Sequence, residues 1–239
     1  MISKKQKTLK RCMLAVLLLL IPSMLYAACT GSSPTWITTP DYASVNTCVQ
    51  GASAGDTVNV TAGDGSETWN STLNIPRNIN LVGPGRDSLV ITLGVSNDYN
   101  IKTGVWSGGS ISGFEFLTTA DYSGVILRGT GWRIHHNRYR NELTGSANGV
   151  FVWASGSDTT TTPEGLIDNN EVINGKTIVT GGGNFNNEST HWASASTIGT
   201  EKTVYIEDNV FSMTWNGGSN CTDANRSGRY VFRYNNFLC

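Results

Sequence analysis

A short motif that recurs along the chain constrains its fold more than any other feature. An apolar anchor is followed by two further residues, an Asn, any residue and a second apolar residue, and the anchors are Ile111, Ile134, Ile167, Ile206 and Phe232. The Asn is present in four of the five segments, and Phe114 takes its place in the first. The anchors are separated by 23, 33, 39 and 26 residues, and irregular periods in this range are typical of solenoids. We therefore expect short strands that stack in parallel, about 4.8 Å apart.

Two properties of Asn suit it to a corner between strands. It tolerates the left-handed backbone that a tight corner needs, and its amide can hydrogen-bond to the Asn of the coils on either side. The longer spacings are explained by polar insertions at 155–165 and 181–201, which we expect to be loops. Second strands are expected at 149–154 and 176–180.

The N-terminal part of the chain adds a capping helix to this pattern. Residues 41–63 combine a short amphipathic segment with a Gly55-Asp56 turn that leads into a strand, and residues 73–85 are typical of a first full coil. With the repeat, these segments make residues 41–239 resemble the pectate-lyase-like (pectin-lyase-fold) proteins. The resemblance implies an all-β chain that folds as a single-stranded, right-handed parallel β-helix with an N-terminal capping helix. It implies a fold more than a reaction, since this scaffold carries lyases, hydrolases, adhesins and phage tailspikes.

The catalytic motifs of that family are not found in the sequence. Pectate lyases of this fold carry a Trp-Ile-Asp-His stretch, and the nearest segment here, Trp132 to His136, lacks the Asp. The Arg-x-Pro-x-x-Arg stretch is missing, as are the Asn-Thr-Asp, Asp-Asp and Gly-His-Gly motifs of the related polygalacturonases. No catalytic residue is therefore carried over from either group.

The first residues have the pattern of a secretory signal peptide. Basic residues precede the apolar run MLAVLLLLIPSMLYA, and Ala28 follows it. This pattern predicts that residues 1–27 are removed, leaving a domain at 28–239 that is secreted or displayed at the cell surface. The apolar run is too short for a transmembrane span. Because the sequence stops within a strand segment at Cys239, we expect the domain to be truncated at its C-terminus and to belong to a longer protein.

Removal of the signal segment leaves an acidic chain. The five basic residues within 1–27 leave and no acidic residue does, so the 17 basic residues fall to 12 against 18 acidic ones, a formal net charge of −6. A chain of this charge lacks the basic surface that binds nucleic acid, so we expect no nucleic-acid partner.

Export also implies an oxidising compartment, in which cysteines are candidates for disulfides. Four cysteines remain after residue 27, and they allow three connectivities. Proximity along the chain favours the pairs Cys29–Cys48 and Cys221–Cys239. The alternative for Cys29 is that it carries the lipid of a lipoprotein, which would leave Cys48 without this partner.

One column of polar side chains follows from the register of the motif. The residues directly after the five anchors are Ser112, His135, Asp168, Glu207 and Arg233. With the coils in register, Asp168 and Glu207 are neighbours, and two carboxylates that close raise one pKa unless a cation lies between them. The column is a candidate acid–base pair or Ca²⁺ site, with a surface ion-pair ladder as the alternative. His135 and His136 would point to opposite faces of an extended strand, which argues against a metal ion shared by the two.

Two further groups of residues are candidates. Asp223 and Arg229 place a carboxylate near an arginine, although Asp, Asn and Gly also build turns for local reasons. Exposed tryptophans stack on sugar rings as they do on other flat apolar ligands. Trp153, Trp192 and Trp215 are therefore candidates for carbohydrate binding, with packing as the alternative for each.

Two classes of function fit these features. The missing motifs favour a secreted or cell-surface, adhesin-like module that binds a polysaccharide or surface glycan. The alternative is a polysaccharide lyase, in which an arginine or histidine removes the proton next to a uronate carboxylate and Ca²⁺ neutralises that carboxylate.

Overall fold

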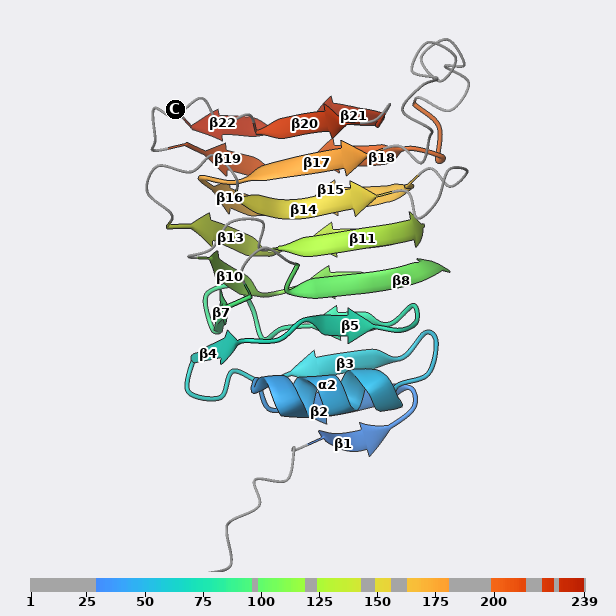
Figure 1. Ribbon diagram of the computed structural model, residues 1–239, viewed down its shortest axis with the longest axis vertical. Helices are drawn as coiled ribbons and strands as arrows, with labels where there is room; N and C mark the ends of the chain where they lie inside the picture. Colours follow the sequence, from blue (N-terminus) through green and yellow to red (C-terminus); the bar gives the residue numbers. More distant parts are fainter. Residues whose placement is uncertain are drawn as a thin grey trace, which may run out of the picture.

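The protein is a parallel β-solenoid, seen in a computed structural model that describes residues 29–95, 99–118, 124–142, 149–155, 163–180, 199–213, 221–225 and 228–238. In these residues the strands form three stacked sheets, which we call A, B and C. The chain passes through the three sheets in the order A, B, C and makes about six turns. Figure 1 shows the coils stacked along the long axis, with sheet C facing the viewer. The expected all-β parallel β-helix is confirmed.

Each coil contributes its strands to these sheets in parallel, and sheet A begins with two further strands, of which the first pairs antiparallel with the second. Sheet A consists of β1 (Cys29–Ser32), β2 (Thr35–Thr38), β3 (Thr57–Val60), β6 (Asn80–Val82), β9 (Ser110–Ser112), β12 (Trp132–His135), β15 (Gly165–Asp168), β18 (Val204–Glu207) and β21 (Tyr230–Arg233). Sheet B consists of β4 (Ser66–Trp69), β7 (Val90–Leu93), β10 (Glu115–Thr118), β13 (Arg138–Asn141), β16 (Glu171–Ile173), β19 (Val210–Ser212) and β22 (Asn236–Leu238). Sheet C consists of β5 (Leu73–Ile75), β8 (Ile101–Ser107), β11 (Val125–Thr130), β14 (Val150–Ser155), β17 (Lys176–Thr180) and β20 (Thr222–Asn225).

Strands such as β3 and β12 form because apolar side chains alternate with polar ones, so that one face is buried. In sheet C, the strands β11, β14 and β17 have runs of consecutive buried residues, so both faces of these strands are partly covered. The anchors Ile111, Ile134, Ile167 and Ile206 are paired in register through sheet A and are at most 2% exposed. The strands expected near 149–154 and 176–180 are β14 and β17. The strand expected after the Gly55-Asp56 turn, through Val58 and Val60, is β3, and both of these side chains are buried in the core. The coil that begins at β3 precedes the segment 73–85, which was expected to be the first full coil.

The corner between sheets A and B is held by the expected ladder of Asn side chains. The Nδ2 of Asn137 lies 3.2 Å from Oδ1 of Asn170, that of Asn170 lies 3.0 Å from Oδ1 of Asn209, and that of Asn209 lies 2.9 Å from Oδ1 of Asn235. Each Oδ1 also accepts the backbone N–H of the preceding rung, as Asn170 does from Asn137 at 3.0 Å. Asn137, Asn170 and Asn209 are at most 1% exposed, so the ladder satisfies buried backbone groups that water cannot reach.

The left-handed residue of this corner is not the ladder Asn, as the sequence had suggested, but the residue before it. His136, Asn169, Asp208 and Tyr234 have φ between 55° and 58°. This conformation costs a non-glycine residue about 1–2 kcal/mol. The hydrogen bonds of the following Asn offset that cost, which explains why a histidine and a tyrosine are tolerated there.

A single helix among the described residues, α2 (Tyr42–Gly51), covers the N-terminal end of the core. Its N-cap Asp41 accepts a hydrogen bond from the backbone N–H of Ser44 at 2.9 Å. Val45, Cys48 and Val49 are fully buried on its inner face. The expected capping helix is therefore present.

The disulfide Cys29–Cys48 joins strand β1 to this helix, as expected from proximity. A cross-link that closes a loop of this size stabilises a fold by about 3 kcal/mol in the chain-entropy model. Cys221 is half-buried before β20, whereas Cys239 lies outside the described residues, so the second pairing stays a prediction. Residues 1–28 also lie outside them, and the signal peptide stays a prediction. Within the described part of the chain, no helix has the length and apolar character to cross a membrane.

Candidate functional site

The column expected on sheet A is present in register. Ser112 pairs with His135, His135 with Asp168, Asp168 with Glu207, and Glu207 with Arg233 on adjacent strands. These positions alternate with the buried anchors, so their side chains belong to the outer side of the sheet.

Asp168 is held by a neighbouring arginine that the column itself does not contain. Nε of Arg133 donates to Oδ1 of Asp168 at 2.8 Å, and a terminal nitrogen of Arg133 lies 2.5 Å from Oδ2. Asn169 donates to the same Oδ2 at 2.7 Å. Burial acts to raise the pKa of the Asp168 carboxyl, but the hydrogen bonds from Arg133 and Asn169 outweigh it and hold this pKa below its usual range. Asp168 is therefore an ionised ion-pair partner.

Glu207 is held in the same way by the last member of the column. Nε of Arg233 lies 2.5 Å from Oε2 of Glu207. The Arg233 guanidinium also lies over two aromatic rings, 4.9 Å from the centroid of Tyr205 and 5.4 Å from that of Tyr234. A cation therefore accompanies each of the two carboxylates, which is the ion-pair ladder given above as the alternative. The catalytic role of the column stays a prediction.

The two histidines meet at the end of β12, contrary to the expectation that they point to opposite faces. Their Nδ1 atoms lie 2.9 Å apart, and their rings are nearly perpendicular. The reason is that His136 follows the last residue of β12 and is itself the left-handed corner residue, so the alternation of faces along an extended strand does not apply to it. Burial and then the nearby Arg133 charge lower the pKa of His135, so its imidazole is neutral at physiological pH. Among the described residues no group of three or more His, Cys, Asp or Glu side chains is placed to hold a metal ion.

Asp223 and Arg229 are not brought into this column. Asp223 lies on β20 of sheet C, opposite Ile178, and Arg229 lies in the segment that leads to β21. In the part of the chain that the structure describes, no ion pair joins them. Sheet A and sheet C are separate faces of the solenoid, so the five-residue column and Asp223 cannot form one compact site.

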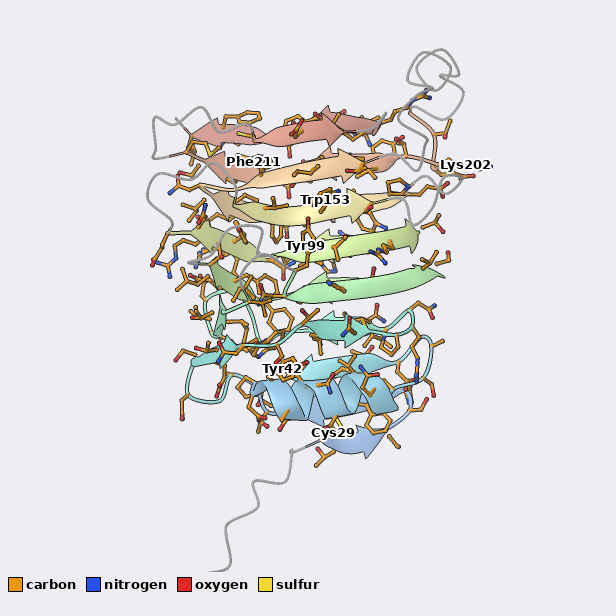
Figure 2. The ribbon with its side chains drawn as sticks, in the orientation of Figure 1. Cys29, Tyr42, Tyr99, Trp153, Lys202 and Phe211 are labelled. Carbon is orange, nitrogen blue, oxygen red and sulfur yellow. A yellow bond between two sulfur atoms is a disulfide. The ribbon has the colours of Figure 1, made fainter. Side chains whose placement is uncertain are left out.

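The outer face of sheet C carries the tryptophan expected to bind carbohydrate. Trp153 is half-buried, and its indole N–H donates to Oγ1 of Thr180 on the next coil at 2.6 Å. The ring of Tyr99 meets it edge-on, with centroids 5.4 Å apart. Figure 2 shows both residues on the sheet that faces the viewer. Trp192 and Trp215 lie outside the described residues. Trp153 is thus a fixed aromatic on a flat strand face.

One column of side chains runs along this outer face. Asn74, Lys102, Ile126, Trp153, Ile178 and Asp223 occupy successive paired positions. Ile126 and Ile178, on either side of Trp153, are only 8% and 6% exposed, so Trp153 is the apolar side chain of this column that remains accessible. Lys102 lies toward one end of the column and Asp223 lies at the other. An aromatic ring with polar groups on either side is a combination found in ligand-binding surfaces.

An ion-pair network on sheet B was missed by the sequence analysis. Guanidinium nitrogens of Arg138 lie 2.7 Å from a carboxylate oxygen of Glu171, 3.0 Å from one of Glu115 and 2.9 Å from one of Asp87. A guanidinium nitrogen of Arg140 lies 3.0 Å from the other carboxylate oxygen of Glu115. The carboxylates, Glu171 first, raise the pKa of the Arg138 guanidinium. The signal was available, because Glu115, Arg138 and Glu171 each directly follow the corner position of the motif. Because the charges of this network are paired with one another, we assign it a role in stability and not in binding a ligand.

Comparisons with known proteins give no match to a family model, to a curated protein or to a solved structure.

Proposed function

We propose that the chain is a secreted or cell-surface module that binds a polysaccharide or surface glycan along the outer face of sheet C. The observation that carries this proposal is Trp153, held in place by Thr180 and Tyr99 on that face. An immobilised indole offers apolar area at little cost in side-chain entropy, which favours stacking on a sugar ring.

The lengths of the connections support the choice of this face. From the third coil onward, sheets A and B are joined by two residues, as at 136–137 and 169–170. The segments at the two ends of the sheet C strands are unequal, and they range from one residue at 131 and two residues at 174–175 to the longer segments 142–149, 156–164 and 181–203. Connections that vary in length while the scaffold stays constant are where binding residues concentrate.

The electrostatics of sheet A favour binding over catalysis. A general base works best with a pKa near the operating pH, whereas Arg133 holds the pKa of Asp168 low. Glu207 is likewise bound to Arg233. Export is supported by the pattern of residues 1–27 and by the disulfide Cys29–Cys48, which needs an oxidising compartment. Kinship with the pectate-lyase-like proteins is part of the proposal, supported by the parallel coils and the Asn ladder.

The experiment is retardation of the purified protein in gels or on columns that carry plant, bacterial and animal polysaccharides. Trp153→Ala is expected to lose retardation on the glycan that binds the wild type. Tyr205→Ala is the matched control, because Tyr205 is also a half-buried outward aromatic, but on sheet A. Equal retardation of Trp153→Ala and wild type on every glycan would refute a binding face on sheet C.

A polysaccharide lyase remains the second candidate, and His135 is the observation that favours it. Its neutral imidazole is suited to remove a proton. A lyase would produce unsaturated sugar ends, detected by their ultraviolet absorbance. His135→Ala should abolish this absorbance, whereas Ser112→Ala, one coil away in the same column, should retain it. Binding without turnover by the wild type would exclude the lyase.

A further inference from the structure

The corner between sheets A and B turns one side chain back toward the end of the strand that precedes it. Asn169, a left-handed corner residue, donates from Nδ2 to Oδ2 of Asp168 at 2.7 Å. His136 holds the same position one coil earlier, and its Nδ1 lies 2.9 Å from Nδ1 of His135. The coil with two histidines therefore brings two imidazole nitrogens together through a feature that the fold repeats.

The backbone that carries this pair is fixed by the Asn ladder. Nδ2 of Asn137 donates to the carbonyl of His135 at 3.0 Å, and the backbone N–H of Asn137 donates to Oδ1 of Asn170 at 3.0 Å. Asn137 is fully buried, whereas His136 is exposed and His135 is half-buried. The two imidazoles are thus accessible to solvent on a frame that is already ordered, which lowers the entropic cost of binding a ligand.

The surroundings of the pair suit a bound cation. A hydrogen bond between two imidazole nitrogens needs one nitrogen with a proton and one with a lone pair, so a metal ion that replaces this proton gains two ligands. The nearby positive charge of Arg133 is compensated, because its Nε donates to Asp168 at 2.8 Å. Among the described residues no third His, Cys, Asp or Glu joins the pair, so water would supply the other ligands.

The distance between the two nitrogens indicates which ion fits. Imidazole nitrogens bind divalent transition metals at about 2.0–2.1 Å, so two of them lie about 2.9 Å apart at a right angle and about 3.3 Å apart at a tetrahedral angle. The observed Nδ1 to Nδ1 distance is 2.9 Å. Right angles are typical of Cu²⁺ with nitrogen and oxygen ligands, whereas Zn²⁺ prefers a tetrahedron.

We propose that His135 and His136 bind one Cu²⁺ ion through their Nδ1 atoms, with water completing a square plane. The two lone pairs converge on the ion when the rings turn slightly about their side-chain torsions, which an exposed residue such as His136 does at little cost. The site lies on sheet A, so it does not depend on the glycan proposed for sheet C.

The test is electron paramagnetic resonance of the purified protein, free of any histidine tag, with one equivalent of Cu²⁺. The nitrogen hyperfine splitting counts the imidazoles bound to the ion, and we expect two. His136→Asn should leave one and weaken Cu²⁺ binding at least about tenfold, because loss of a mere hydrogen-bond partner of a metal ligand costs about that much. The variant should fold, since Asn169 has the same left-handed conformation one coil further on. His135→Gln tests the other ligand without changing the corner residue.

The matched control is His191→Gln, which removes the third histidine of the sequence, a residue outside the described part of the chain. It should keep the wild-type spectrum and affinity. Fewer than two bound imidazoles in the wild type would overturn the site, as would equal losses of affinity in His136→Asn and His191→Gln. Zn²⁺ at the same concentration should leave the spectrum unchanged. A return to the spectrum of aqueous Cu²⁺ on adding Zn²⁺ would overturn the assignment to a square-planar ion.

Discussion

The corner between sheets A and B and the ends of the sheet C strands are built in opposite ways. At the corner, two residues connect the strands from the third coil onward, and each rung repeats the hydrogen bonds of the previous one. At the ends of sheet C, the connections differ in length from coil to coil. A solenoid needs one side where neighbouring coils are identical, since register and stacking depend on repetition. The other side is then free to diversify. Stability should therefore depend on the corner and binding on sheet C.

The largest expected effect is on the corner. Asn170→Ala removes an amide that donates to Ile134 O at 2.9 Å and accepts the N–H of Asn137 at 3.0 Å, both in the core. Leaving such groups unsatisfied costs about 3 kcal/mol in the free energy of unfolding. Urea unfolding measures this loss, and Asn74→Ala, an exposed Asn on sheet C, should change stability by less than about 0.5 kcal/mol. Similar losses for the two variants would contradict the distinction between corner and face.

The ion-pair network on sheet B should have the next largest effect. Arg138→Leu removes the partner shared by Glu115, Glu171 and Asp87. Because Glu115 is only 6% exposed, its charge is left with Arg140 alone, and we expect a loss of about 2 kcal/mol. Thermal unfolding measures this loss of stability, and the control is Arg86→Gln, which removes an arginine charge from the segment between β6 and β7. Glycan retardation should be unchanged, and a loss of retardation without loss of stability would move the binding face to sheet B.

Trp153→Ala should lower the affinity for the glycan more than it lowers the stability of the fold. A central aromatic of an interface is expected to contribute at least about tenfold to affinity. Stability should fall less than for Asn170→Ala, since Trp153 lies on the outer face of the sheet and is half-buried. Titration calorimetry with the retarding glycan, together with urea unfolding, separates the two quantities. A stability loss as large as that of Asn170→Ala would identify Trp153 as a packing residue.

The smallest effect is the pH dependence of the sheet A column. The folded-state pKa of Asp168 lies below its ordinary value, so the pair with Arg133 stabilises the fold above the ordinary carboxyl pKa of about 3.9. This stabilisation is lost as the pH falls through the lowered folded value. We expect about 1 kcal/mol, since the Arg133 side chain is 45% exposed. Unfolding of wild type and Asp168→Asn at pH 7 and pH 2 measures it. A difference that grows toward low pH would reverse the sign and refute the pairing.

The sequence by itself determined the coil, its register and the Asn ladder. An apolar anchor followed three residues later by Asn, repeated five times with one substitution, leaves one parallel stacking that turns every anchor toward the core, because side chains alternate between faces with a period of two. The column of Ser112, His135, Asp168, Glu207 and Arg233 followed directly from that register. So did the pair Cys29–Cys48, from proximity.

Only the tertiary structure decided how these polar side chains pair. Arg133 reaches diagonally to Asp168 on the next coil, and His136 turns back onto His135 through a left-handed corner. Neither contact can be predicted from the register of the strands, because a long side chain on one coil can reach several neighbours on the adjacent coils. A periodic sequence specifies which residues share a rung, whereas the reach of individual side chains between rungs specifies the site.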